Sequence, residues 1–320
     1  MEENKTKLPR VSSNPHIRDH ITTNKIMLIV VIALLIPAGY GVYHFGLKAL
    51  LIIALSVCGS VFFEWAFCKI AHKAPTIGDL SAVVTGILLA LNLPVSVPWW
   101  IPVIGSVFAI VVVKMLYGGL GKNFMNPALG ARCFLLISFP KLMTDFAYDA
   151  VSGPTPLAQL KSGNLTTNIT DMIIGNTAGT IGETSMIAIV IGACIMIMLG
   201  VIDLYVSGTY IAAFAVFLLL FSGKGLDMAF LCAHLAGGGL MLGAFFMATD
   251  YVTRPVSKKG QIIYGIFLGF LTAIFRCFSP SAEGVSYAII IGNLLVPIIE
   301  KFTVPVPFGV KKSNNKGGKK

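Results

Sequence analysis

Long apolar runs constrain this chain more than any other feature of its sequence. The clearest runs are Ile26–Tyr43, Ile101–Met115, Met186–Ile202 and Tyr210–Phe221. A run of about 20 apolar residues is long enough for a helix to cross a hydrocarbon core of about 30 Å. Only 12% of the 320 residues are charged, against about 25% in soluble domains. The sequence therefore predicts an all-α polytopic membrane protein.

We expect about ten membrane segments. Glycine and proline separate them, and two of them, the third and the fifth, are short for a full crossing. Short or interrupted segments are typical of broken helices around a site in the middle of a membrane. The ten segments are 26–43, 47–66, 79–93, 99–117, 127–140, 185–202, 208–222, 229–249, 262–278 and 285–300.

The distribution of basic residues predicts the orientation. An even number of segments places the basic tails 1–25 and 302–320 on the same side, and 18 of the 24 Lys and Arg residues then fall on that side. An excess of Lys and Arg marks the cytoplasmic side of a membrane protein. We therefore expect both termini in the cytoplasm and loop 141–184 outside the cytoplasm. The net charge of +10 thus indicates membrane topology and not nucleic-acid binding.

The chain divides into two halves of five segments each, a first membrane repeat at 26–140 and a second at 185–301. An odd number of segments in each half inverts the second half relative to the first, as in many transporters. The stretches 85–98 and 242–255 share a glycine, a valine and a proline at a constant offset of 157 residues. This similarity favours an inverted repeat, although three identities also arise by chance.

A glycine-rich stretch, "GGLGKNFMNPALGAR" at 118–132, is the first candidate site. Pro127 suits the first position of a helix, and such an end presents unpaired backbone N–H groups. Asn123 and Asn126 then either bind a ligand with their amides or cap the helix. Arg132 lies deeper in the same segment, where a charge must find a partner or an anionic ligand. An aquaporin-like pore is excluded, because the second half has no matching motif.

Acidic residues near segment ends are candidates for ion coupling. Glu64, Asp203 and Asp250 all lie within or beside apolar runs, where carboxylates are costly and often functional. For Asp250, a local ion pair with Arg254 is an equally good alternative. For Arg276, near an outer end, we expect the side chain to extend to the membrane surface.

The polar loop contains the stretch "DAVSGPTPLAQL" at 149–160. Prolines on both sides of Thr155 fix the backbone and keep its neighbours out of a helix. Gly153 allows a turn, and Asp149 and Ser152 lie in the same stretch. The stretch is either a rigid turn or a segment that exposes the Thr155 hydroxyl to an enzyme.

The cysteines predict no metal site. They occur singly in or beside apolar runs and form no CxxC pair, which excludes the usual iron–sulfur and zinc spacings. They are either small buried apolar residues or ligands of a cluster shared with a partner subunit. The six are Cys58, Cys68, Cys133, Cys194, Cys232 and Cys277.

Several motifs in order resemble one family. "GDLSAVVTGILLALNLP", "GKNFMNPALGAR", "SGPTPLA", "FMATD" and "EGVSYAIIIGNLLVP" resemble the D subunit of the Rnf ion-translocating ferredoxin:NAD+ oxidoreductase. The chain is similar also to the B subunit of the Na+-pumping NADH:quinone oxidoreductase, which usually has a longer N-terminal extension. The length of 320 residues favours the Rnf member.

The resemblance implies two flavins. It implies an FMN joined by a phosphoester bond to Thr155, within a motif that here reads from Asp149 through Ser152 and Gly153, with Pro154 where the family commonly has alanine. It further implies a non-covalent riboflavin near Asn123 and Asn126.

The resemblance also implies the protein's role and partners. It implies a subunit of a translocase that is not catalytically complete alone, with a urea-transporter-like fold, in a bacterial plasma (inner) membrane. The implied partners are a flavin transferase and the A, B, C, E and G subunits of the Rnf complex. The alternatives are a urea-transporter-like solute channel and a purely structural anchor.

Overall fold

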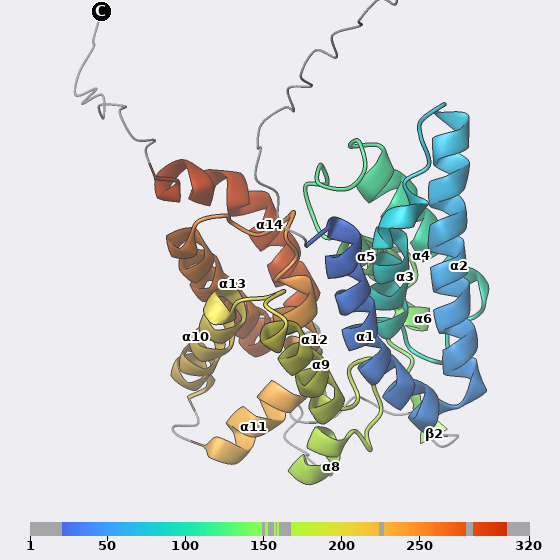
Figure 1. The fold of residues 1–320 in the computed structure, drawn as a ribbon. Helices are drawn as coiled ribbons and strands as arrows, with labels where there is room; N and C mark the ends of the chain where they lie inside the picture. The colour runs from blue at the N-terminus through green and yellow to red at the C-terminus, as the bar shows by residue number, and fades with distance from the viewer. Residues whose placement is uncertain are drawn as a thin grey trace, which may run out of the picture.

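The computed structural model describes residues 21–148, 151, 152, 157, 159, 168–223, 227–279 and 284–305. The first half of the chain forms two long helices followed by shorter ones (Figure 1). Its elements are α1 (Thr23–Phe45), α2 (Leu47–Ile70), the 3-10 turn η1 (Ile77–Asp79), α3 (Ser81–Leu91), α4 (Trp100–Val107), the π-helical η2 (Phe108–Met115), α5 (Pro127–Ser138) and α6 (Pro140–Met143).

A two-residue hairpin and further helices form the rest. The hairpin pairs β1 (Ala147–Tyr148) with β2 (Val151–Ser152) in antiparallel register. The remaining elements are α8 (Ile169–Ile174), α9 (Met186–Met198), α10 (Leu204–Ser222), α11 (Met228–Ala236), α12 (Leu240–Leu242), the π-helical η3 (Gly243–Met247), α13 (Lys258–Phe278) and α14 (Gly284–Thr303).

Helices account for all ten predicted segments, but they differ in length. Five of them, α1, α2, α10, α13 and α14, are long and apolar enough to cross a membrane, and α11 with α12–η3 forms a sixth candidate, bent by 62°. The helices of the other four segments contain fewer than 18 residues, too few for a straight crossing. The chain is a helical multi-pass membrane protein.

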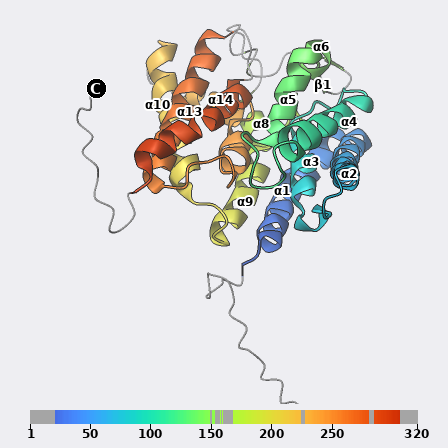
Figure 2. The same ribbon diagram turned by 90° about the horizontal axis from the view of Figure 1, so that it is seen from above.

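The two halves lie side by side and share one core (Figure 2). Helix α1 packs against α9, and α5 packs against α14. Glycines allow the closest approach between helices: a Cβ on Gly269 of α13 would lie 2.6 Å from the backbone nitrogen of Phe214 in α10. Small residues at such contacts are typical of membrane helices, because there the association depends on close packing.

Much of the polar loop lies outside the described residues. Asp149, Gly153 and Thr155 are among the residues not described, and Ser152 belongs to β2. Two residues beyond Thr155, Leu157 is 2% exposed in a small apolar cluster with Met172 of α8 and with Ala233 and Ala236 of α11. The loop is therefore fastened to the second half of the molecule at this point.

Candidate functional site

A cavity lies where the two halves meet. Its empty volume, which includes space open to solvent at the mouth, is about 750 Å³. Its walls come from the starts of α1, α3 and α5, the end of η2, the loop before α5, the end of α9 and the segment that follows η3. The polar residues of the lining are Ser81, Thr85, Lys114, Asn123, Asn126, Thr249, Asp250 and Tyr251.

Asn126 caps helix α5 and also lines this cavity. Its Oδ1 accepts from the backbone N–H groups of Ala128 and Leu129 at 3.0 and 3.3 Å, and Pro127 occupies the first helical position. This local prediction of a helix start is confirmed. The Asn126 amide nitrogen donates to the Met247 carbonyl at the end of η3, at 3.5 Å, which ties the two halves together beside the cavity.

Asn123 leaves part of its amide open to the cavity. Its Nδ2 donates to the Met125 carbonyl at 3.0 Å, while within the described ranges its Oδ1 accepts no hydrogen bond. Three glycines shape the loop that carries Asn123, and their positive φ angles of 117°, 93° and 87° are unfavourable for other residues. They are Gly118, Gly119 and Gly121.

Asp250 lies in the cavity wall directly after η3. Its carboxylate accepts from the Val252 N–H and the Thr253 hydroxyl, both at 3.3 Å. Burial raises the pKa of Asp250, and these hydrogen bonds and the Arg254 charge offset part of the rise. The alternative of a local Asp250–Arg254 ion pair is wrong: Arg254 lies 4.6 Å from the centre of the Tyr251 ring, and the described part of the chain contains no such pair.

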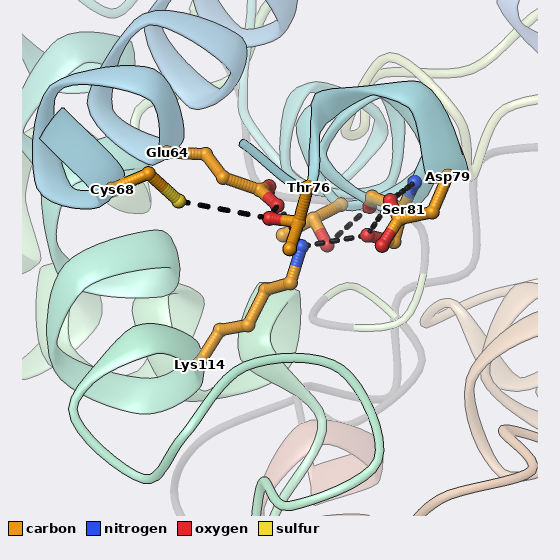
Figure 3. Close-up of polar contacts among 7 residues, drawn as sticks. Glu64, Cys68, Thr76, Asp79, Ser81 and Lys114 are labelled. Carbon is orange, nitrogen blue, oxygen red and sulfur yellow. Dashed lines mark hydrogen bonds and ion pairs between the residues drawn. The ribbon is translucent and has the colours of Figure 1, made fainter. Parts of the chain in front are cut away.

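Glu64 belongs to a buried charge network behind the cavity (Figure 3). Its Oε2 accepts from the Lys114 ammonium at 2.7 Å, and both side chains are at most 3% exposed. Its Oε1 accepts from the Thr76 hydroxyl. Lys114 also donates to the Ser81 Oγ at 2.6 Å, and this hydroxyl donates to Asp79 at 2.5 Å. The network thus holds two carboxylates and one ammonium.

Lys114 connects the network to the cavity, because it is both the partner of Glu64 and part of the cavity wall. Lys114 is one of the 18 basic residues that the charge pattern assigns to the cytoplasmic side, and its burial in an ion pair was not predicted. The available signal was its position within an apolar run, where a lysine must find a partner. Its place in a π-helical segment fits the frequent occurrence of such segments at functional sites.

Arg132 has a partner, as predicted, but it does not line the cavity. Its Nη1 donates to the Asn92 Oδ1 at 2.6 Å, and Asn92 in turn donates to the Leu88 carbonyl at 2.6 Å. Asn92 was not singled out from the sequence. Asn92 follows the end of α3, whereas the start of α3 forms part of the cavity wall. The Arg132–Asn92 pair therefore lies away from the cavity.

Arg276 does not reach the membrane surface, and that prediction is wrong. Its side chain is 1% exposed and donates to the carbonyl of His234 in the last turn of α11 and to those of Gly237 and Gly238 in the break between α11 and α12. The break leaves backbone acceptors that need donors, and the guanidinium supplies them. Asp203 is exposed at the start of α10 and lies outside the cavity.

The arrangement suits a planar ligand with polar edges. The walls of the cavity are mainly apolar, and its polar groups include one open amide oxygen, several hydroxyls and one ammonium. The starts of α3 and α5 both line it, and helix starts favour negative charge. The cavity therefore combines apolar walls with groups of both charges, the Lys114 ammonium and the Asp250 carboxylate.

Comparison with known proteins identifies the family. Residues 10–309 match the model of the NQR2, RnfD, RnfE family. The D subunit of the Na(+)-translocating ferredoxin:NAD(+) oxidoreductase complex of Acetobacterium woodii is 47% identical over 310 residues, 94% of this chain and 96% of the relative.

Two further relatives extend the match. The D subunit of the proton-translocating ferredoxin:NAD(+) oxidoreductase complex of Clostridium ljungdahlii is 38% identical, over 94% of this chain and 96% of its own. The D subunit of an ion-translocating oxidoreductase complex of Methanosarcina acetivorans is 34% identical, over 93% and 96%. The chain therefore belongs to the NQR2, RnfD, RnfE family.

Proposed function

We propose that this chain is the membrane flavoprotein subunit of an Rnf-type complex, which passes electrons between ferredoxin and NAD+ and couples their passage to Na+ or H+ transport. The observation that carries the proposal is the cavity, which brings Asn123, Asn126 and Asp250 together with the Lys114–Glu64 pair. The similarity to the D subunits of three such complexes supports the same role. The chain acts with the A, B, C, E and G subunits of the Rnf complex.

The residues of the cavity fit a non-covalent riboflavin. A flavin ring has apolar faces, carbonyl acceptors and an N–H donor, and the cavity offers apolar walls, the open Asn123 Oδ1 and the Lys114 ammonium. When bound, the flavin supplies the electron-carrying chemistry. Asn123 would orient the ring, Asn126 would hold the start of α5 in the cavity wall, and Lys114 would supply a positive charge there.

The covalent FMN belongs on Thr155, within the motif that begins at Asp149 and includes Ser152 and Gly153. The support is that Leu157 is buried against α8 and α11, so the chain is held two residues from the attachment point. Two residues span at most about 7 Å. The attached group therefore starts close to the folded surface of the second half, where the flavin transferase places it.

The attachment is tested on the denatured protein. We expect a gel band that fluoresces under ultraviolet light and a mass raised by one FMN phosphoester. Thr155→Ala abolishes both, whereas the exposed control Thr144→Ala retains both. Fluorescence that survives in Thr155→Ala contradicts the attachment site.

An inverted repeat with a urea-transporter-like fold and cytoplasmic termini completes the proposal. In its support, α2 and α10 begin at Leu47 and Leu204, 157 residues apart, and α4 and α13 begin at Trp100 and Lys258, 158 apart. These offsets match the one in the sequence. The start of α1 and the end of α14 lie towards the same end of the molecule (Figure 1), as an even number of crossings requires.

Ion coupling falls to the carboxylates at the cavity. Glu64 is fully buried next to it and Asp250 is in its wall, whereas Asp203 is exposed. The names of the relatives include both a Na+-translocating and a proton-translocating complex, so one fold serves either cation. Ion transport by Glu64→Gln and Asp250→Asn complexes in vesicles tests this: both should transport less than wild type, and unchanged transport in both contradicts it.

A further inference from the structure

We propose that Lys114 is an internal counter-ion shared by the cavity and Glu64, and that its ammonium couples the charge in the cavity to cation uptake at Glu64. This inference rests on the proposed function, because it takes the cavity as the flavin site. It assigns a positioning role to a residue that does not itself carry electrons.

The first support is the bonding of the Lys114 ammonium. A lysine has three N–H donors, and two of them bond Glu64 and Ser81, at 2.7 and 2.6 Å. Both Lys114 and Ser81 line the cavity. Since a lysine is a point charge on a flexible stem, a small displacement moves its charge from the Glu64 side towards the cavity.

The second support is the charge of the network. With all groups ionised, Glu64 and Asp79 carry two negative charges against the single positive charge of Lys114 (Figure 3). The Cys68 thiol is the remaining titratable group drawn there, 3.8 Å from the Thr76 hydroxyl. Without the Lys114 charge, two carboxylates face each other across Ser81 and Thr76, and a cation is needed to replace it.

The third support is access from one side. Thr76, which donates to Glu64, is exposed, and Asp79 is half-buried. Deeper in the membrane, Ser60 and Ser56 precede Glu64 at intervals of four residues and so lie on the same face of α2. Both serines are 0% exposed, and their hydroxyls have no hydrogen-bond partner in the described part of the chain. One turn and two turns of helix α2, about 6 and 12 Å, separate these hydroxyls from Glu64, so they form a polar face that leads inward from it.

The coupling step balances in charge. One electron from reduced ferredoxin, delivered through the complex, adds one negative charge to the cavity. The Lys114 ammonium shifts towards that charge, and Glu64 takes up one Na+ or H+ from the side of Thr76. When the electron leaves, Lys114 returns to Glu64 and displaces the cation. One cation is taken up for each electron.

The test is a redox titration of the non-covalent flavin in the purified whole complex, at several Na+ concentrations and pH values. In wild type, the midpoint potential should rise with the concentration of the coupling cation. Lys114→Met removes a positive charge and lowers the potential, Glu64→Gln removes a negative charge and raises it, and both lose the cation dependence. Lys114→Arg keeps a positive charge and so should keep a potential near that of wild type, but its less mobile guanidinium should weaken the cation dependence.

A double variant keeps the test decisive if the single variants fold poorly. Glu64→Gln with Lys114→Met removes one charge of each sign, so its potential should lie near that of wild type while the cation dependence is lost. Shifts of the same sign in both single variants, or a cation dependence that survives in the double variant, overturn the inference. A wild-type complex that lacks non-covalent flavin but carries the covalent FMN overturns the cavity assignment, and the inference with it.

Discussion

Among the buried cations of the described residues, Lys114 in the first half and Arg276 in the second are held in opposite ways. Lys114 is 2% exposed and faces a carboxylate, a hydroxyl and a cavity. Arg276 is 1% exposed and is bound by three backbone carbonyls, with its guanidinium 5.0 Å from the centre of the Phe214 ring. A flexible ammonium between charged groups can move, whereas a planar guanidinium in a cage of carbonyls is fixed.

This difference indicates which buried charge is structural. Arg276 supplies donors to the end of α11, where a break of the helix leaves carbonyl groups without partners. Lys114 has partners on two sides. Burial alone therefore does not identify a functional charge in a membrane protein; the number of places that the charge can occupy does.

The largest expected effect is on the structural charge. Arg276→Leu removes three charge-assisted hydrogen bonds, each worth about 1.5–3 kcal/mol, and we expect a loss of about 5 kcal/mol in the free energy of unfolding. Thermal unfolding in detergent measures it. Arg276→Lys keeps the charge but loses the planar, forked donor geometry of the guanidinium. Its free energy of unfolding should lie between those of wild type and Arg276→Leu. An unchanged melting temperature in Arg276→Leu would show that the break does not depend on this residue.

A smaller loss of stability is expected when Lys114 is substituted. Lys114→Met leaves Glu64 buried without its partner, which costs about 3 kcal/mol. The double variant with Glu64→Gln should recover most of this loss of free energy, since the carboxylate that lost its partner is then removed as well. Arg276 differs in this respect, because its hydrogen-bond partners are backbone carbonyls, which no second substitution removes. Equal stabilities of the single and double variants would contradict the pairing.

The two asparagines at the cavity should also differ in what they contribute, Asn126 to stability and Asn123 to ligand binding. Asn126→Ala removes the cap of α5 and should cost about 1 kcal/mol of stability. Asn123→Ala removes the open amide and should weaken riboflavin binding several-fold with little change in stability. Unfolding and equilibrium dialysis with riboflavin measure the two effects. If both variants change only stability, the cavity is not a flavin site.

The smallest effect is expected at the exposed carboxylate. Asp203→Asn lies outside the cavity, and a substitution at such a surface position usually changes stability little. Transport by reconstituted complex should stay close to that of wild type, in contrast to Glu64→Gln. A loss of transport as large as that in Glu64→Gln would place the ion route near α10 instead.

Local signals predicted part of this site and distant contacts determined the rest. Asn126-Pro127 predicted the start of α5, since a cap and a first-turn proline are adjacent in sequence. The Glu64–Lys114 pair joins residues 50 positions apart, and no periodicity indicates that contact. Arg276 was misjudged because its partners are backbone carbonyls of another helix, exposed only where that helix breaks. The apolar runs predicted the helices, and the shortness of the third and fifth segments is confirmed in α3 and α5, but that of α4–η2 and of α9 was not predicted.

The most direct test of redox-coupled ion transport through this protein is the number of cations moved per electron. It is measured in proteoliposomes that contain the whole complex, with reduced ferredoxin and NAD+. Wild type should move cations as electrons flow, and the Glu64→Gln, Lys114→Met double variant should pass electrons while cation movement is largely lost. Full cation movement per electron in the double variant would contradict the role assigned to this pair.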